Sequence, residues 1–156
     1  GTYPLTEGVT DRFMAAISLG RASAEEEVEV LTGRRGRAQL SNVIRVATMD
    51  ELATCRAQAQ QVHLADAVAT YAVGILHATR AHQWVRLGAS TRGGVAMIAL
   101  AKAFALMDGR DYVAPHDVGR AAQCALAHRL VLVGQDRSSA AQVVAECVAA
   151  VQAPRR

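Results

Sequence analysis

Small apolar residues recur at helical spacing through most of the chain after residue 40, and this pattern limits the fold more than any other feature. One stripe follows the i, i+3, i+4, i+7, i+8 pattern of an amphipathic helix and consists of Val68, Tyr71, Ala72, Ile75 and Leu76. Hydrophobic residues make up 51% of the 156 residues, but aromatic residues only 4%. Because β-sandwiches favour β-branched and aromatic residues, we predict an all-α helical bundle with a short N-terminal segment appended to it.

Capping signals predict where several helices begin and end. Ser23, followed by the acidic residues 25–27, predicts a helix that ends at Gly33. Thr48-Met49-Asp50-Glu51 has the form of a capping box. The alternative is an apolar strand over residues 44–51 whose final Asp-Glu pair holds magnesium. Arg45 interrupts the apolar run, so the capping box is the favoured interpretation.

Further helices are expected on both sides of these signals. A short amphipathic piece runs from Thr10 to Gly20, and its last residues could be either a helical tail or a strand. A nearly all-apolar helix is predicted over Ser90–Met107. Pro115 at a first helical position opens the next helix, and a last helix covers residues 143–151.

The sequence offers few signs of metal, membrane or nucleophilic chemistry. The three cysteines, Cys55, Cys124 and Cys147, lie far apart in apolar helical patterns, so we predict that they are small core residues. The five histidines lack metal-ligand spacing, and no phosphate-binding GxxxxGK[ST] loop is present. No apolar run reaches 18 residues, so no membrane span is expected. The first residues also do not resemble a signal peptide.

The start of the helix at Ser90 combines a cation with two glycines, as Ser90-Thr91-Arg92-Gly93-Gly94. A positive charge in the first turn of a helix costs about 0.3–1 kcal/mol, and each glycine costs roughly 1 kcal/mol relative to alanine. The free N–H groups of a helix N-terminus attract anions, phosphate especially. An anion site at Arg92 would explain the arrangement. Pairing of Arg92 with a surface carboxylate is an equally good explanation from the residues alone.

A basic loop suggests a second kind of partner. Arg34, Arg35 and Arg37 could contact phosphate, but no aromatic residue is interleaved with them to stack on a base. A solvated loop is therefore the better interpretation, in keeping with the mild net charge of +3. A nucleic-acid-binding module that uses this loop and Arg155-Arg156, or a plain interaction bundle without a ligand, are the alternative functions.

Three motifs give residues 87–130 a resemblance to the C-terminal lid domain of MoxR-type AAA+ ATPases. They are Gly-Ala-Ser-Thr-Arg (88–92), Gly-Arg-Asp-Tyr-Val-Ala-Pro-His-Asp-Val (109–118) and His-Arg-Leu (128–130). Residues 1–20 are similar to the segment that closes the ATPase core of that family. The resemblance implies four parts: the end of the core (1–21), a helix and linker (22–42), a helical lid of AAA+ type (43–152) and a tail (153–156).

The resemblance also implies roles for individual residues. Arg92 matches the sensor 2 arginine, which reaches the terminal phosphates of ATP, with Ser90 and Thr91 beside it. Arg12 matches the arginine finger that acts on the nucleotide of a neighbouring subunit. ATP and magnesium are implied for the full-length protein, whereas this chain lacks both Walker motifs and is expected neither to hold them nor to hydrolyse ATP alone.

For the whole protein, the resemblance implies a cytoplasmic hexamer of chaperone type. Its partners would be its own AAA+ core, neighbouring subunits and an unknown client whose assembly or metal cofactor insertion it assists, and nucleic acid is not expected. The sequence departs from the family pattern at four residues: Thr6 and Thr91 replace proline, Gly93 replaces alanine, and Ala114 replaces a capping threonine. The last change should cost about 1 kcal/mol.

Overall fold

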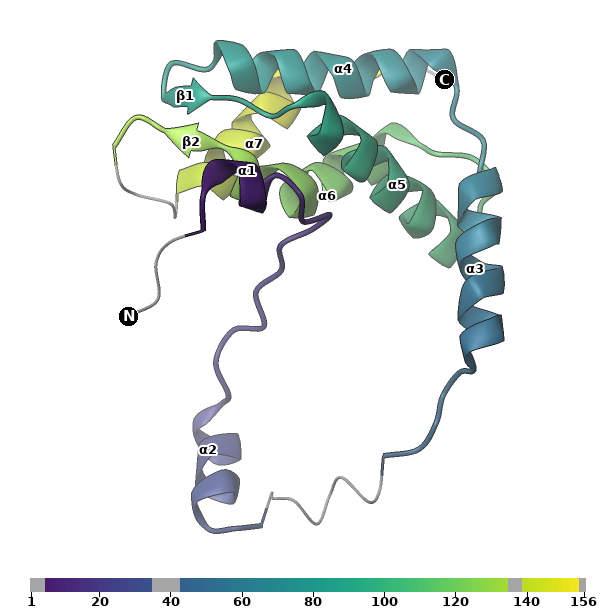
Figure 1. Ribbon diagram of the computed structural model, residues 1–156, viewed down its shortest axis with the longest axis vertical. Helices are drawn as coiled ribbons and strands as arrows, with labels where there is room; N and C mark the ends of the chain where they lie inside the picture. Colours follow the sequence, from purple (N-terminus) through teal and green to yellow (C-terminus); the bar gives the residue numbers. More distant parts are fainter. Residues whose placement is uncertain (1–4, 35–42, 135–138, 155–156) are drawn as a thin grey trace. The chain divides into compact units, whose positions relative to one another are not determined.

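The computed structural model describes residues 5–34, 43–134 and 139–154 (Figure 1). The chain divides into two compact units. One comprises Gly1–Ala16 together with Arg56–Arg156, and the other comprises Ile17–Cys55. The first unit combines residues 1–16 with the helical bundle. The sequence analysis instead divided the chain into four consecutive parts, with residues 1–21 separate from the lid.

The larger unit is a bundle of helices around a core of small and medium-sized side chains, as predicted. Its helices are α1 (Glu7–Thr10), α4 (Asp66–Ala81), α5 (Thr91–Met107), α6 (Pro115–Leu126) and α7 (Ser139–Ala150), with the 3-10 helix η2 (Ala127–Arg129) after α6. Helix α5 packs mainly against α6, and α7 packs against α4 and α6. The largest fully buried apolar side chains are Ile75, Met97, Val118, Leu126 and Val144. Alanines fill the space between them, and this allows the helices to approach closely.

A small antiparallel sheet was not predicted. Strand β1 (Val85–Leu87) pairs with β2 (Val131–Leu132), and the Val133 N–H donates to the Trp84 carbonyl at 2.9 Å. Strands this short are too brief to display the alternating pattern by which strands are recognised. The sheet joins the connection between α4 and α5 to the segment that follows η2.

The smaller unit contains α2 (Ala24–Leu31), and α3 (Met49–Gln61) begins in it. Both predicted caps are present. Glu26 N–H donates to Ser23 Oγ at 3.3 Å, and Glu51 N–H donates to Thr48 Oγ1 at 3.1 Å. Each glutamate in return accepts from the backbone N–H of its cap residue. The magnesium-binding strand considered as an alternative is therefore absent, because residues 49–51 belong to a helix.

The prediction that all three cysteines are core residues is wrong for one of them. Cys147 is buried and Cys124 is half-buried, but Cys55 is exposed. Cys55 lies at the end of the smaller unit, where no described residue is buried, so its apolar neighbours form no core around it. Burial raises the pKa of the Cys147 thiol. No helix in the described parts of the chain has the length and apolar character needed to cross a membrane.

Candidate functional site

The first turn of α5 is capped as predicted. Ser90 Oγ accepts a hydrogen bond from the Gly93 N–H at 3.3 Å, which satisfies one of the free donors at the helix N-terminus. Ser90 is half-buried, whereas Thr91 and Arg92 are exposed. The first turn contains no acidic residue. The cap therefore leaves the Arg92 side chain exposed in the first turn of the helix.

The turn before α5 is held tightly against the end of α4. The Ala89 N–H donates to Oγ1 of the fully buried Thr79 at 3.1 Å, and Arg80 Nε donates to the Ala89 carbonyl at 2.9 Å. Gly88 lies so close to α4 that a Cβ on it would be 2.7 Å from Arg80 Cα and 2.8 Å from Arg80 N. These contacts determine where α5 begins and hence where Arg92 is presented.

We expect Gly88→Ala to destabilise the chain by about 1–3 kcal/mol, the usual cost of overpacking. The contact is with backbone atoms of Arg80, which cannot move aside as a flexible side-chain end would. Gly8→Ala is the matched control, because a Cβ at Gly8 would meet nothing within 4 Å. Urea denaturation measures both variants, and a Gly88→Ala protein as stable as Gly8→Ala would contradict the close approach.

Arg92 makes no ion pair or side-chain hydrogen bond with any residue that the structure describes. Among the described residues, no carboxylate therefore pairs with Arg92, although the sequence allowed such a pair. An exposed guanidinium that is unpaired at the positive end of a helix is available to an anion from outside. This agrees with the anion interpretation of the sequence, but the glycines beside Arg92 need a different explanation.

The two glycines in the first turn of α5 pack closely against neighbouring side chains. A Cβ on Gly93 would lie 3.1 Å from Arg129 Cδ, and a Cβ on Gly94 would lie 2.7 Å from Leu76 Cδ1. Both glycines are buried. The close approach of η2 and α4 thus gives both glycines a packing role that does not depend on an anion site.

The N-terminal segment reaches the same place through Asp11. Ser90 Oγ donates to Asp11 Oδ1 at 2.9 Å, and Arg129 Nε donates to the same oxygen at 3.1 Å. The carboxylate of Asp11 therefore bridges the cap of α5 and the arginine that ends η2. This three-residue contact, Asp11–Ser90–Arg129, was not predicted, since its members are far apart in the sequence.

The same arginine binds the segment after Thr10, where the sequence suggested a short amphipathic piece with either a helical tail or a strand at its end. Helix α1 ends at Thr10, and Arg129 donates to the carbonyls of Asp11 (3.0 Å), Phe13 (2.6 Å) and Met14 (3.3 Å). A helix would use such carbonyls for its own hydrogen bonds. Residues 15–19 form neither a helical tail nor a strand.

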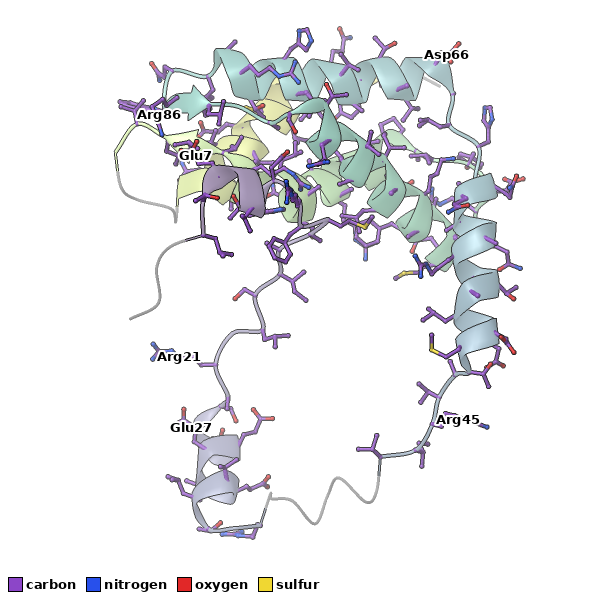
Figure 2. All side chains as sticks on the ribbon, viewed as in Figure 1. Glu7, Arg21, Glu27, Arg45, Asp66 and Arg86 are labelled. Carbon is purple, nitrogen blue, oxygen red and sulfur yellow. The ribbon has the colours of Figure 1, made fainter. Side chains whose placement is uncertain are left out.

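Arg12 lies within this anchored segment, and its side chain is exposed. No ion pair or side-chain hydrogen bond joins it to another described residue. The structure thus places two exposed arginines, Arg12 and Arg92, on segments that meet at the Asp11–Ser90 contact. A surface ion pair between Glu7 and Arg86 (2.8 Å) also joins α1 to β1, and Figure 2 shows these two side chains together.

Three potential metal ligands gather at the start of α6, but an arginine occupies the space between them. Asp108, His116 and Asp117 lie close enough to share an ion. Arg110, however, donates to both oxygens of the fully buried Asp117 carboxylate, at 2.7 and 2.8 Å, and to Asp108 at 2.9 Å. The guanidinium supplies the positive charge that a metal would supply, so this cluster is structural.

Asp117 supplies one half of a capping box at Ala114, whose side chain has no oxygen to supply the other half. Its carboxylate accepts the Ala114 N–H at 2.8 Å. Burial pushes the pKa of Asp117 upward, but hydrogen bonds from Arg110 and the Ala114 N–H outweigh it, and the pKa lies below its usual value. The same hydrogen bond to Asp117 raises the pKa of Arg110. The motif at 109–118 therefore builds a stable turn between α5 and α6.

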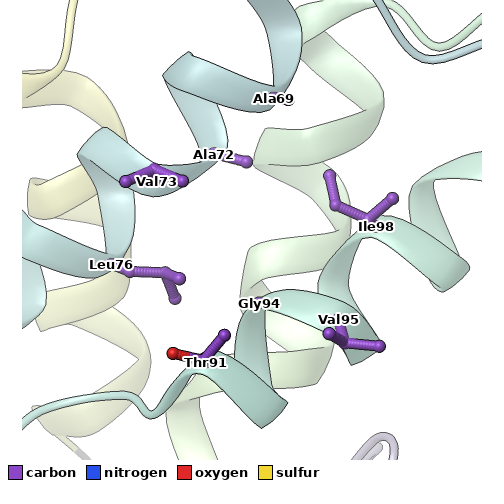
Figure 3. A pocket seen from close by; sticks show the side chains of 8 residues that line it. All are labelled: Ala69, Ala72, Val73, Leu76, Thr91, Gly94, Val95 and Ile98. Carbon is purple, nitrogen blue, oxygen red and sulfur yellow. The ribbon is translucent and has the colours of Figure 1, made fainter. Parts of the chain in front are cut away.

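An apolar groove of about 300 Å³ lies between α4 and α5. Figure 3 shows Leu76 of α4 and Ile98 of α5 on opposite sides of it. Thr91 is the sole polar residue among the described residues that line it. Without a charged group, this groove does not suit a nucleotide phosphate. Arg92 therefore remains the candidate anion contact.

Comparison with known proteins relates this chain to a protein family. Residues 77–147 match the family model described as the AAA lid domain. The chain is 35% identical over 141 residues to chaperone MoxR1 of Mycobacterium tuberculosis, covering 85% of this chain and 37% of that protein. It is 34% identical to the protein YeaC of Bacillus subtilis, covering 99% of this chain and 49% of that protein.

A solved structure agrees with these matches. The crystal structure of a candidate ATPase from Cytophaga hutchinsonii superposes with a TM-score of 0.81 at 26% identity, covering 99% of this chain and 51% of that one. The fold and the family model define an AAA lid domain. The chain belongs to the MoxR-type AAA+ proteins, and its residues 77–147 correspond to their C-terminal lid. It spans about half or less of the relatives that it matches.

Proposed function

We propose that this chain is the ATP-sensing part of a MoxR-type AAA+ ATPase. Residues 1–21 would close the ATPase core, 22–42 would form a helix and linker, 43–152 would form the lid, and 153–156 the tail. In the full-length protein, ATP and magnesium would bind in the core. The lid would then add Arg92 as a sensor 2 residue, with Ser90 and Thr91 at the same helix end.

The observation that carries this proposal is the guanidinium of Arg92 in the first turn of α5, which is exposed and has no partner among the described residues. The turn at Gly88 and Ala89 holds that end rigidly against α4, so Arg92 would approach the phosphates in a defined position. Closure of the lid over ATP would bring a bidentate donor to the terminal phosphates. It would also exclude water from the reaction.

The rest of the functional hypothesis follows from the family. A neighbouring subunit would receive Arg12 as an arginine finger, in a cytoplasmic oligomer that is expected to be a hexamer. Hydrolysis would drive chaperone-like maturation or assembly of a client, including metal cofactor insertion. Of the basic loop suggested for nucleic acid, only Arg34 lies among the described residues, and it donates to Thr32 Oγ1 at 3.2 Å. Nothing described favours the nucleic-acid alternative.

Arg92→Ala in the full-length protein is expected to lower the rate of ATP hydrolysis about 100-fold, the usual loss when one donor to developing charge is removed. Binding of a fluorescent ATP analogue should weaken as well, because Arg92 would contact the bound nucleotide. Arg56→Ala is the matched control, since Arg56 is an exposed arginine on another helix, α3. Turnover in Arg92→Ala equal to that of Arg56→Ala would overturn the sensor assignment.

A further inference from the structure

Arg129 uses all of its side-chain N–H groups in hydrogen bonds, most of them to the N-terminal segment at residues 11–14. It is only 6% exposed. Its five N–H donors find five oxygen acceptors: Asp11 Oδ1 and the carbonyls of Asp11, Phe13, Met14 and Ala125. Four of these acceptors belong to residues 11–14. An arginine with all five donors used in this way fixes the geometry of the groups around it.

Arg12 lies in the middle of the segment that Arg129 holds. The backbone is fastened immediately before it, at Asp11, and immediately after it, at Phe13. The ring of His128 lies 3.0 Å from the Phe13 carbonyl and adds a further contact. Arg12 itself has no side-chain partner among the described residues. The backbone on both sides of Arg12 is therefore held in place, while the Arg12 side chain itself is exposed.

Lysine could not replace these contacts. Its ammonium carries three donors on a single nitrogen and cannot reach acceptors spread on both sides of a planar fork. The stem of a lysine could still pack against Gly93, where the Arg129 Cδ lies 3.1 Å from an added Cβ. Arg129→Lys would thus retain charge and most of the packing while it releases the segment that carries Arg12.

We propose that Arg129 is a positioning residue that holds Arg12 in the orientation needed to reach the nucleotide of the neighbouring subunit. This inference rests on the proposed function, because it assigns a task to Arg129 only if Arg12 acts as a finger. Asp11 extends the contact to Ser90, at the cap of α5. The segment of Arg12 is therefore linked to the first turn of α5 as well as to η2.

In the full-length protein, Arg129→Lys is expected to lower ATP turnover about 100-fold, the loss typical of a misplaced catalytic group. The affinity of the same subunits for an ATP analogue should stay within about twofold of the wild type, since Arg92 and its cap are intact. A variant that merely weakens the fold would lower both. Size-exclusion chromatography and circular dichroism establish that the variant is folded and assembled.

Mixing experiments separate positioning of the finger from support of the subunit's own site. Subunits with Arg129→Lys are mixed with subunits carrying Arg92→Ala, which still present a correctly held Arg12. The Arg129→Lys sites then receive a working finger from their neighbours, and turnover should rise at least about tenfold above that of either variant alone. Mixing Arg129→Lys with Arg12→Ala is the control, and it should give no recovery because both partners lack a working finger.

Each outcome decides one of the two proposals. If Arg12→Ala and Arg92→Ala lower turnover but the first mixture shows no recovery, Arg129 does not position the finger and the proposed function stands. If Arg12→Ala and Arg92→Ala both turn over at the wild-type rate, the proposed function itself fails. Should Arg129→Lys not fold, Asp11→Asn loosens the same contact from the other side. It should show the same recovery pattern with a smaller initial loss, and absence of recovery would again overturn the inference.

Discussion

Replacement of Arg12 by alanine in the full-length protein is expected to lower ATP turnover about 10³-fold, the lower end of the range for an arginine finger. The guanidinium would stabilise the charge that spreads over the transferred phosphoryl group in a neighbouring subunit. Because Arg12 would not contact the nucleotide of its own subunit, the affinity of that subunit for ATP should hardly change. Steady-state hydrolysis and equilibrium binding of an ATP analogue, measured on the same preparation, test both parts.

Arg21→Ala is the matched control for this experiment. Arg21 is another exposed arginine close to the N-terminus, but it lies beyond the segment that Arg129 fastens at residues 11–14. Its removal should leave turnover within about twofold of the wild type. Equal turnover in Arg12→Ala and Arg21→Ala would exclude Arg12 as the finger, whatever the result for Arg92.

The largest expected effect on stability comes from Asp117. Asp117→Ala should reduce the free energy of unfolding by about 3 kcal/mol, near the lower end of the cost of removing one partner from a buried ion pair. The side chain of Arg110 remains 19% exposed and keeps its contact with Asp108, and this limits the loss. The Ala114 N–H would also lose its acceptor. Urea denaturation followed by circular dichroism measures the change.

The pH dependence of this contribution follows from the lowered pKa of Asp117. A carboxyl with a depressed folded-state pKa contributes stability that is fully present above its unfolded pKa, about 3.9. That contribution is lost as the pH falls through the lower folded-state pKa. Asp117→Asn lacks this titration. The stability gap between the wild type and Asp117→Asn should therefore be constant near neutral pH and narrow below about pH 4, and a gap that widens in acid would contradict this assignment.

Local signals predicted the helices well because helix formation depends on residues close in sequence. The stripe from Val68 to Leu76 and the caps at Ser23, Thr48 and Ser90 all involve partners within one or two turns, and the structure contains each of them. The motifs that resemble the AAA+ lid also lie within short stretches. For the same reason Arg92 could be chosen as a candidate from its place in a helix, without knowledge of its surroundings.

Long-range contacts could not be predicted in this way. The β1–β2 pair joins residues more than forty positions apart, and the two strands contain too few residues to show a pattern. Cys55 was misassigned because an apolar neighbourhood in the sequence does not guarantee a core in space. The glycines at 93 and 94 were interpreted through the nearby arginine, whereas the atoms packed against them belong to Arg129 and Leu76.

The sequence by itself determined that the chain is helical, where most helices begin, and which family it resembles, because these depend on local patterns of apolar, capping and turn residues. The tertiary structure alone decided what surrounds each candidate residue. It showed that Asp11, Ser90 and Arg129 meet, and that Arg110 occupies the acidic cluster at Asp117. The reason is physical: a buried charge must find its partners within a few ångströms in space, and the fold brings those partners from distant parts of the chain.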